Sequence, residues 1–295
     1  MGILDRLKSL VHREKQLDVG ARFELLRAAV SGTMSSFYMA KDRKSGKVVG
    51  LKLCDAEKLA LFEARFTGMN KPLEGEIAIS LKHPRVVETL EHGITNEGLR
   101  YLVMEFLDGP GLHTLIQNRD TILDGNRFTL ICQMAEALKY VHDARFLHRD
   151  ICPRNFICSP DATSLKLIDF GLTVPAQPQF MQPGNRTGTA AYMSPEVVRR
   201  RPTDHRLDLF SFGMTAYHLC ANTLPWPVGK NPALAAMSHD STPPQDILKY
   251  RPQLDPVLGQ AIMQCLHADP AARPQTAGDF LYLVRQVRHE TAVDD

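Results

Sequence analysis

The stretch that decides the fold is residues 148–171, which read HRDICPRNFICSPDATSLKLIDFG. Within it, Asn155 follows Asp150 by five positions, and Asp169 follows Asn155 by fourteen. Carboxylate and amide oxygens are hard ligands of the kind that Mg²⁺ prefers. Moving a phosphoryl group requires cations on its oxygens and a carboxylate near the attacking hydroxyl. The stretch therefore carries the groups that metal-assisted phosphoryl transfer needs.

Length and composition predict a soluble, folded chain of about two domains. The chain has 295 residues, of which 44% are hydrophobic and 23% are charged, and a domain takes roughly 150 residues. Its formal net charge of +2 leaves no excess of basic residues for nonspecific nucleic-acid binding. We therefore expect no nucleic-acid partner.

No apolar run approaches the ~20 residues that cross a bilayer, and the N-terminus lacks a signal-peptide core with a cleavage site. We therefore expect a cytoplasmic protein with no transmembrane segment. The six cysteines include no C-x-x-C pair. This spacing predicts free thiols rather than a zinc site or a disulfide framework.

Residues 1–19 are expected to form an N-terminal extension. Within residues 1–10, apolar side chains at helical spacing alternate with charged ones, which predicts a short amphipathic helix. We favour docking of this helix on its own domain over contact with a membrane. A separate docking partner for the helix stays open.

Two domains of different class follow. Runs rich in β-forming residues predict strands of an antiparallel sheet at 25–30, 37–40, 48–53, 86–91 and 100–105. A helix is predicted over 57–66, and it is expected to restart with Asn70 as N-cap and Pro72 in the first turn. Beyond 108–111 the pattern becomes helical, with an apolar stripe from Leu130 to Val141. The predicted fold class is therefore α+β.

The ordered set of motifs resembles the protein kinase family over roughly Phe23 to Arg288. The matching pieces are H-R-D at 148–150, D-F-G at 169–171, and the segment 188–196, which resembles the family's stretch ending in A-P-E. The resemblance implies a bilobal protein-kinase-like fold, with a small antiparallel-sheet N-lobe carrying helix C and a larger, mainly α C-lobe. The implied boundaries are 20–105 for the N-lobe, 106–110 for the hinge and 111–295 for the C-lobe. ATP and Mg²⁺ are the implied cofactors, and a protein with a Ser or Thr acceptor is the implied substrate.

Lys52 matches the lysine of the family's V-A-I-K motif, because residues 49–52 read VGLK. The resemblance implies that Lys52 reaches the α- and β-phosphates. Three glutamates, Glu63, Glu74 and Glu76, compete for the ion pair with this lysine. Counting back nine positions from the His83-Pro84 pair that resembles the family's HP after helix C selects Glu74.

The resemblance places further residues around the nucleotide. The phosphate-covering loop should read G-x-G-x-x-G, but Val30 and Ser35 stand at its outer glycines and only Gly32 is kept. Glycines let backbone amides approach phosphate, so this cover is expected to be stiffer. The implied contacts to the base are Phe37, Gly50, Met104, Glu105, Leu107 and Ile157. Phe37 is larger and Gly50 smaller than the family's valine and alanine, an exchange that can conserve volume.

The catalytic loop departs from the pattern of serine/threonine kinases. The implied catalytic residues are Asp150, Lys52, Arg154 and Asn155, and the implied metal ligands are Asn155 and Asp169. Cys152 stands where these kinases carry a lysine, two positions after the Asp. Because a thiol supplies no positive charge, we expect Arg154 to return toward Asp150 and supply the cation.

Residues 188–196, after the D-F-G motif, resemble the corresponding segment of serine/threonine kinases. Thr189 matches the threonine typical of that class, and the resemblance implies that Glu196 pairs with Arg273. Because a buried glutamate without its arginine costs about 3 to 5 kcal/mol, this pair is expected to be structural rather than catalytic. Residues 199–201 are three arginines that either select acidic substrates or form a solvated face.

Three functions fit this pattern. The favoured one is an ATP-dependent serine/threonine protein kinase, because Lys52, Asp150, Asn155 and Asp169 are all kept. A catalytically weak pseudokinase or scaffold is motivated by the glycine loop and Cys152. A small-molecule phosphotransferase of the aminoglycoside or choline kinase type ranks third, since those enzymes lack a segment like residues 189–196.

Overall fold

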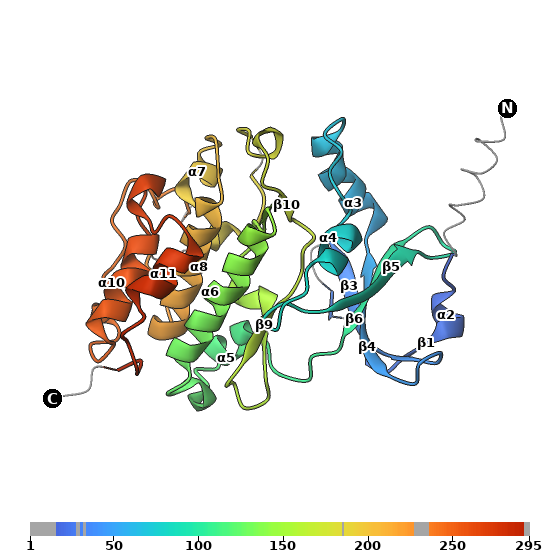
Figure 1. The fold of residues 1–295 in the computed structure, drawn as a ribbon, viewed down its shortest axis with the longest axis horizontal. Coiled ribbons are helices and arrows are strands. Elements are labelled where there is room, and N and C mark those ends of the chain that lie inside the picture. Colours follow the sequence, from blue (N-terminus) through green and yellow to red (C-terminus); the bar gives the residue numbers. More distant parts are fainter. Residues whose placement is uncertain (1–15, 28–29, 32–33, 185, 227–235, 292–295) are drawn as a thin grey trace. The chain divides into compact units, whose positions relative to one another are not determined.

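The structure of the chain is a computed structural model that describes residues 16–27, 30–31, 34–184, 186–226 and 236–291 (Figure 1). The predicted helix over residues 1–10 and Gly32 lie outside these residues. The chain divides into two compact units. The first comprises residues up to 82 together with 88–107, and the second comprises 83–87 together with residues from 108 onward.

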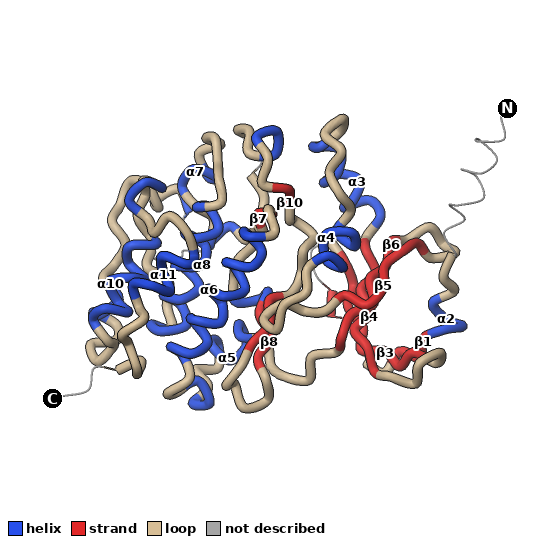
Figure 2. Tube along the Cα trace, in the orientation of Figure 1, coloured by secondary structure: helices blue, strands red, loops and turns tan. Residues whose placement is uncertain are grey.

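The first unit is built on an antiparallel sheet (Figure 2). Its strands are β1 (Phe23–Leu25), β2 (Val30–Ser31), β3 (Ser35–Asp42), β4 (Val48–Cys54), β5 (Thr89–Ile94) and β6 (Arg100–Glu105). The order across the sheet is β1-β3-β4-β6-β5, and β2 pairs with β3. Between β3 and β4, Asp42 accepts hydrogen bonds from the Lys44 amide and the Ser45 hydroxyl, and Gly46 takes the positive φ of 73° that closes the hairpin.

One face of this sheet forms a core. Side chains alternate across a strand, so every second residue points to the same face. The core face buries Ala40 of β3, Val49 and Leu51 of β4, and Tyr101 and Val103 of β6, and Phe23 joins them. The opposite face therefore carries Phe37, Gly50 and Lys52, the residues that the sequence assigned to the nucleotide.

Among the described residues of the first unit, the helical segments are α2 (Val19–Arg22), α3 (Ala56–Glu63), η1 (Ala64–Phe66) and α4 (Glu74–Ser80). Asp55 caps α3 by accepting a hydrogen bond of 3.1 Å from the Lys58 amide. The predicted restart at Asn70 is wrong, because Asn70 has a left-handed φ of 49°. The N-cap of α4 is instead Leu73, three residues later, and the Glu76 side chain accepts the Leu73 amide at 2.8 Å.

Two predicted strands also differ from the structure. The run 25–30 is not one strand, since β1 ends at Leu25 and β2 begins at Val30. The run 86–91 is displaced, because β5 begins only at Thr89. The first residues of the run 86–91 bond to the second unit instead. Val86 forms a parallel β-bridge with Leu167, and the Val87 amide donates to the Leu167 carbonyl at 3.0 Å. Residues 83–87 therefore group with the second unit, whereas the sequence assigned them to the first.

The second unit is mainly helical. Its helices are α5 (Leu112–Gln117), α6 (Arg127–Asp143), α7 (Pro195–Val198), α8 (Arg206–Ala221), α10 (Pro256–Cys265) and α11 (Ala277–Leu283), with single 3₁₀ turns η2 (Thr121–Leu123), η3 (Pro153–Asn155), η4 (Pro178–Phe180), η5 (Ala190–Tyr192), η6 (Ile247–Lys249) and η7 (Pro270–Ala272). Two short antiparallel pairs join β7 (Phe146–Leu147) to β10 (Val174–Pro175) and β8 (Phe156–Cys158) to β9 (Leu165–Leu167). The predicted stripe from Leu130 to Val141 is buried on α6. The α+β class is confirmed.

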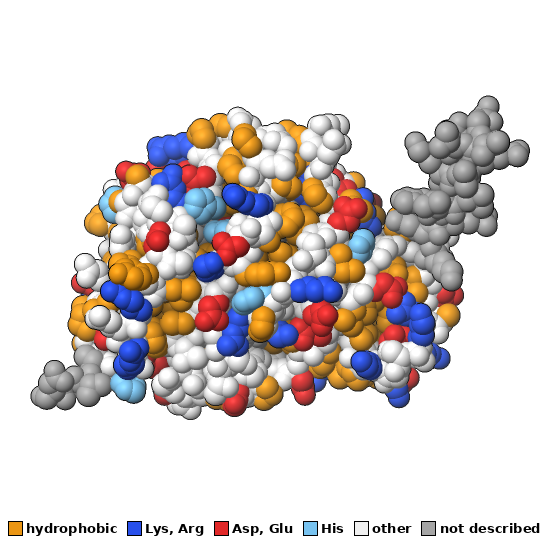
Figure 3. All heavy atoms as spheres, in the orientation of Figure 1, with side chains coloured by type: hydrophobic (Ala, Val, Ile, Leu, Met, Phe, Trp, Pro, Cys, Tyr) orange, Lys and Arg blue, Asp and Glu red, His pale blue; other side chains and the backbone are white. Residues whose placement is uncertain are grey.

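Helix α8 is the buried centre of this unit. Most of its side chains have no access to solvent, and α10 packs against it where Gly213 lies. A β-carbon on Gly213 would lie 2.5 Å from the Cys265 β-carbon, so only glycine permits this approach. None of the helices in the described ranges is both long and apolar enough to span a bilayer. On the face drawn in space-filling form, acidic and basic side chains are interspersed (Figure 3).

A buried carboxylate secures the end of the described chain. Glu290 is 5% exposed, and its Oε1 accepts hydrogen bonds from Arg127 Nη1 at 3.1 Å and from Arg251 Nη2. Its Oε2 accepts the Arg127 amide at 2.8 Å, at the start of α6. Two arginines and one helix terminus thus depend on a single side chain.

We expect Glu290→Ala to lower the free energy of unfolding by about 3 to 5 kcal/mol, because it removes the buried counter-charge of Arg127 and Arg251 and leaves Arg127 only the exposed carboxylate of Asp124. Urea denaturation followed by circular dichroism measures the change. Glu97→Ala, at an exposed position, is the matched control and should shift stability by less than about 0.5 kcal/mol. An equally small shift for Glu290→Ala would contradict the interpretation.

Candidate active site

In the first unit, Lys52 of β4 pairs with Glu74, the first residue of α4. The Lys52 Nζ lies 2.5 Å from Glu74 Oε1, and the two side chains are only 8% and 9% exposed. The pair expected from the sequence is therefore present. The competing glutamates have other partners, because Glu63 binds Arg100 and Glu76 caps the start of its own helix.

Gly75 allows α4 to lie close to the sheet. A β-carbon at this position would be 2.4 Å from the Cγ atom of His92 on β5, closer than real atoms pack. The helix can therefore approach β5 only because residue 75 has no side chain. This approach places the neighbouring Glu74 within reach of Lys52.

The sheet face around Lys52 carries the residues assigned to the base. Phe37 of β3 lies opposite Lys52 of β4 in the sheet, and Gly50 of β4 lies opposite Met104 of β6. A β-carbon on Gly50 would lie 2.7 Å from Phe37 Cζ. The ring of Phe37 therefore fills the space left by the missing side chain of Gly50, as the sequence analysis expected. Ser35 begins β3 opposite Cys54.

Met104 and Glu105 end strand β6. Met104 is 8% exposed, and Glu105 is held against Glu88, whose carbonyl accepts the Glu105 amide at 3.0 Å while its amide donates to Glu105 Oε1 at 2.8 Å. Leu107, the last residue of the first unit, is half-buried. Ile157 belongs to the second unit, where it pairs with Lys166 and bridges Gly111.

In the second unit, Asp150 is held from two sides. The Nδ2 atom of Asn155 donates to the Asp150 carbonyl at 2.7 Å and to its Oδ2 at 3.0 Å. Thr189 donates both its amide, at 2.8 Å, and its hydroxyl, at 2.7 Å, to Oδ1. The carboxylate therefore has one fixed orientation, and the amide oxygen of Asn155 is the atom that can bind a cation.

Asp208 of α8 holds the backbone of the catalytic loop. Its fully buried carboxylate accepts the His148 amide at 2.9 Å and the Arg149 amide at 2.8 Å, and it also contacts His142 Nε2 at 2.9 Å. Burial alone would raise the pKa of Asp208, but the hydrogen bonds and charges of these neighbours outweigh it and hold the pKa below its ordinary value. The two adjacent amides are fixed although Arg149 has a φ of 69°.

Cys152 points inward beside Asp150. It is 1% exposed, and its Sγ lies 3.5 Å from the Thr189 hydroxyl oxygen. Burial, with a contribution from the Asp150 charge, raises the pKa of this thiol to about 12, so it is neutral. Cys152 therefore contacts the Thr189 hydroxyl, which also orients the Asp150 carboxylate, and its thiol supplies no charge there.

Arg154 does not take the position expected for it. Its side chain is exposed, and no hydrogen bond or ion pair joins it to any residue within the described ranges. Its charge acts instead on His113 and Tyr192, whose pKa values it lowers beside the dominant effects of burial. The turn η3 turns Asn155 inward and leaves Arg154 on the surface. The predicted return of Arg154 to Asp150 is therefore wrong.

Asp169 lies next to the catalytic loop through the backbone, because the Ile168 amide donates to the Asn155 carbonyl at 2.8 Å. Phe170 is buried against the ring of His148 at 5.4 Å between centroids, while Asp169, with a φ of 65°, is exposed. The amide oxygen of Asn155 and the carboxylate oxygens of Asp169 are hard ligands, which suit Mg²⁺. The described part of the chain contains no group of three or more His, Cys, Asp or Glu side chains that could hold a metal ion.

Gly188 brings Thr189 to Asp150. It has a φ of 115°, and a β-carbon there would lie 2.6 Å from the Arg149 carbonyl oxygen. Any other residue would be strained and would push the segment off the catalytic loop. Glycine is therefore required for the two Thr189 hydrogen bonds.

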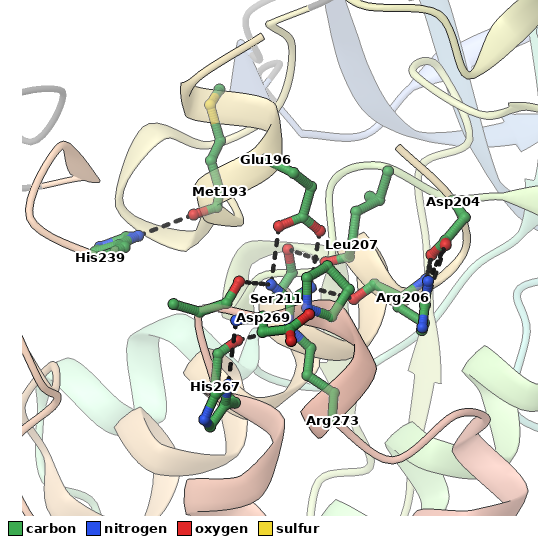
Figure 4. Close-up of polar contacts among 12 residues, drawn as sticks. Met193, Glu196, Asp204, Arg206, Leu207, Ser211, His239, His267, Asp269 and Arg273 are labelled. Atoms are coloured by element: carbon green, nitrogen blue, oxygen red, sulfur yellow. Dashed lines mark hydrogen bonds and ion pairs between the residues drawn. The ribbon is translucent and has the colours of Figure 1, made fainter. Parts of the chain in front are cut away.

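The far end of this segment is anchored by Arg273 (Figure 4). Its Nη1 and Nη2 each lie 2.8 Å from an oxygen of Glu196, and its remaining N–H groups donate to the carbonyls of Arg206, His267 and Ala268. All five guanidinium N–H groups are thus bonded in a side chain that is 1% exposed. The predicted Glu196–Arg273 pair is confirmed.

The arginine run 199–201 is partly engaged. Arg199 and Arg201 both pair with Asp240, the former at 2.7 Å and the latter at 3.6 Å. Arg200 is exposed. The run therefore forms a solvated face with an internal counter-charge rather than a free basic patch.

Comparison with known proteins agrees with these observations. Residues 23–282 match the protein kinase domain family. The chain is 31% identical over 275 residues to a probable serine/threonine-protein kinase of Streptomyces coelicolor, covering 90% of this chain and 40% of that protein. It is 28% identical to the serine/threonine-protein kinase PknB of Mycolicibacterium smegmatis, covering 88% and 42%, and 31% identical to an Aurora kinase of Yarrowia lipolytica, covering 85% and 65%. It thus spans about two fifths of these two bacterial relatives, and it belongs to the protein kinase family.

Proposed function

We propose that this chain is an ATP-dependent protein kinase that transfers the γ-phosphoryl group to Ser or Thr hydroxyls of protein substrates. The observation that carries the proposal is the Asp150 carboxylate, fixed by Asn155 on one oxygen and by Thr189 on the other. The names of the relatives support the same activity.

Asp150 is suited to receive the proton of the acceptor hydroxyl. An ionised carboxylate has about four acceptor sites, and donors among the described residues occupy three of them, two on Oδ1 and one on Oδ2. The remaining site on Oδ2 can accept the substrate hydroxyl. Because the other three bonds fix the carboxylate beforehand, the substrate does not have to orient it.

The other assigned residues would bind the nucleotide. Lys52, held in place by Glu74, supplies a positive charge for the α- and β-phosphates. Asn155 Oδ1 and the Asp169 carboxylate would hold Mg²⁺. The bound cation would neutralise negative charge on the phosphate oxygens.

A catalytically weak protein of the same fold is the second candidate. The buried, neutral thiol of Cys152 favours it, because it supplies no charge at the position where serine/threonine kinases carry a lysine. The retained Lys52–Glu74 pair and the fixed Asp150 favour an active enzyme. The anchored segment 188–196 supports a protein substrate over the small molecule of an aminoglycoside or choline kinase.

A cytoplasmic location is part of the proposal. Its support is that all six cysteines are free thiols, five of them buried, as is usual in a reducing compartment. A docking partner for the amphipathic residues 1–10 stays a prediction.

The proposal predicts Mg²⁺-dependent transfer of labelled γ-phosphate to serine or threonine of a generic acceptor protein. Lys52→Met and Asp150→Asn should each reduce transfer by about a hundredfold or more, through lost phosphate orientation and a lost proton acceptor. Phosphoamino-acid analysis identifies the acceptor. Lys47→Met and Asp143→Asn, both at exposed positions, are the matched controls, and near-normal transfer by both site variants would exclude the kinase function.

The structure also predicts how the missing cation can be restored. Cys152→Lys should raise kcat about tenfold or more, because it places a charge near Asp150 and the transferring group. Arg154→Ala should leave kcat within about twofold, because Arg154 lies away from Asp150 on the surface.

Steady-state kinetics at saturating Mg·ATP measure both variants. Cys152→Met, a side chain of similar length without charge, controls for the change of size. A loss of more than tenfold in Arg154→Ala would show that the arginine does reach the reacting group.

A further inference from the structure

Side chains from separate elements of the second unit gather around Arg154. They are His113 of α5, Arg154 of η3, Tyr192 of η5 and His218 of α8, and we call them the Arg154 cluster. The Tyr192 hydroxyl oxygen lies 2.7 Å from His218 Nδ1, so a hydrogen bond joins η5 to α8. Helix α5 packs against η3, and the charge of Arg154 acts on both His113 and Tyr192. Residues that are remote in the chain are thus brought together.

The Arg154 cluster lies next to both groups that hold Asp150. Thr189 bonds one oxygen of that carboxylate, and the Thr189 carbonyl accepts the Tyr192 amide at 2.9 Å. Asn155 bonds the other oxygen, and Arg154 is the residue before it. An extended peptide advances about 3.3 Å per residue. A side chain a few residues from the acceptor hydroxyl can therefore reach the cluster.

The start of α5 is fixed beside the turn that carries Arg154. Gly111, the N-cap of α5, forms an antiparallel β-bridge with Ile157 of β8, the strand that follows η3 directly. His113 comes two positions after Gly111 and is half-buried. Its Nδ1 atom has no hydrogen-bond partner among the described residues. The ring therefore has an unused polar atom.

The charges that act within the Arg154 cluster are cationic. Burial is the main cause that lowers the pKa of His113, and the Arg154 charge lowers it further. Burial likewise lowers the pKa of His218 to about 4, with a smaller contribution from His113. The causes of these two shifts include no carboxylate of the described residues. The cluster therefore favours an anionic ligand and repels a cationic one.

Arg154 is the member of the cluster that can bind such a ligand. Its side chain is exposed, and no ion pair joins it to a residue in the described ranges. A guanidinium presents its N–H groups as a planar fork that matches the two oxygens of a carboxylate. A neutral imidazole adds one N–H donor. Tyr192 is buried and bonds to the neutral His218, so this pair contributes shape and no charge.

We propose that the Arg154 cluster selects protein substrates with an Asp or Glu side chain within a few residues of the Ser or Thr acceptor. This inference rests on the proposed function and adds the class of substrate to it. Arg154 binds the substrate carboxylate, and His113 is the second donor. Because Arg154 acts on substrate binding and not on the transfer step, its loss raises KM for acidic substrates. Arg199 and Arg201 have no such role, since both already pair with Asp240.

Steady-state phosphorylation of synthetic peptides tests this selection. A neutral parent peptide carries one serine, and its variants carry a single Asp or a single Lys at each of about three positions on either side, a reach of roughly 10 Å. At one or more positions, Asp should raise kcat/KM of the wild type about fivefold, mainly through a lower KM. Lys at the same position should lower kcat/KM by a similar factor.

Two variants assign the preference to Arg154. Arg154→Glu should prefer Lys to Asp at the same position, and Arg154→Gln should lose the preference for Asp without gaining one for Lys. A merely structural role would change the rates for all peptides together and would not exchange the preference. Arg288→Glu, at an exposed position, changes the net charge of the chain by the same amount as Arg154→Glu and should keep the wild-type preference. Circular dichroism of each variant shows that the fold is kept.

The outcomes distinguish this inference from the proposed function. If the folded wild type phosphorylates neither the peptides nor a generic acceptor protein, the proposed function fails and this inference fails with it. If it phosphorylates either of them, but the peptides show no preference for Asp or a preference for Lys, this inference is overturned while the kinase function stands. Retention of the wild-type preference by Arg154→Glu would overturn it equally.

Discussion

The second unit depends on the buried ion pair between Glu196 and Arg273. It fixes one end of the segment 188–196, and the two hydrogen bonds from Thr189 to Asp150 fix the other end. A buried pair of this kind costs about 3 to 5 kcal/mol when one partner is removed. Arg273 also donates to the carbonyl of Arg206 at the start of α8 and to the carbonyls of His267 and Ala268 in the loop after α10. The same pair therefore ties the segment that holds Asp150 to the helical core.

Close approaches at glycine position the site in both units. Gly75 lets α4 reach β5, Gly50 accommodates the ring of Phe37, and Gly188 lets Thr189 reach the catalytic loop. The departures from the family pattern at Phe37 and Gly50 are thus compensated within the sheet. Cys152 is a different case, because its neutral thiol keeps a contact with Thr189 but does not replace a charge.

Residues in ordered motifs were the part of the site that could be predicted from the sequence. The pairs Lys52–Glu74 and Glu196–Arg273 were predicted because Lys52, Glu196 and Arg273 lie in motifs that resemble those of the protein kinase family, and because Glu74 lies nine positions before His83. Arg154 was misplaced because its direction depends on one turn of 3₁₀ helix, which sequence does not specify. Residues 83–87 were misassigned because their partner Leu167 is remote in the chain.

The contacts at Gly75 and Gly188 were missed for a similar reason. A glycine in a sequence shows that the backbone has freedom, but not which neighbour approaches it. The positive φ of Gly188 and the proximity of His92 to Gly75 emerge only from tertiary packing. The α+β class, by contrast, follows from local patterns of strand and helix, and it was predicted correctly even where single strand boundaries were displaced.

The most direct test of the account is single-turnover transfer of γ-phosphate from Mg·ATP by the wild type, Thr189→Ser and Thr189→Val. The account holds that the Thr189 hydroxyl orients the Asp150 carboxylate for proton transfer. It predicts that the serine variant retains most of the transfer rate, whereas the isosteric valine variant loses at least about tenfold with unchanged affinity for Mg·ATP. Equal transfer rates in the wild type and Thr189→Val, or no transfer by the wild type, would contradict it.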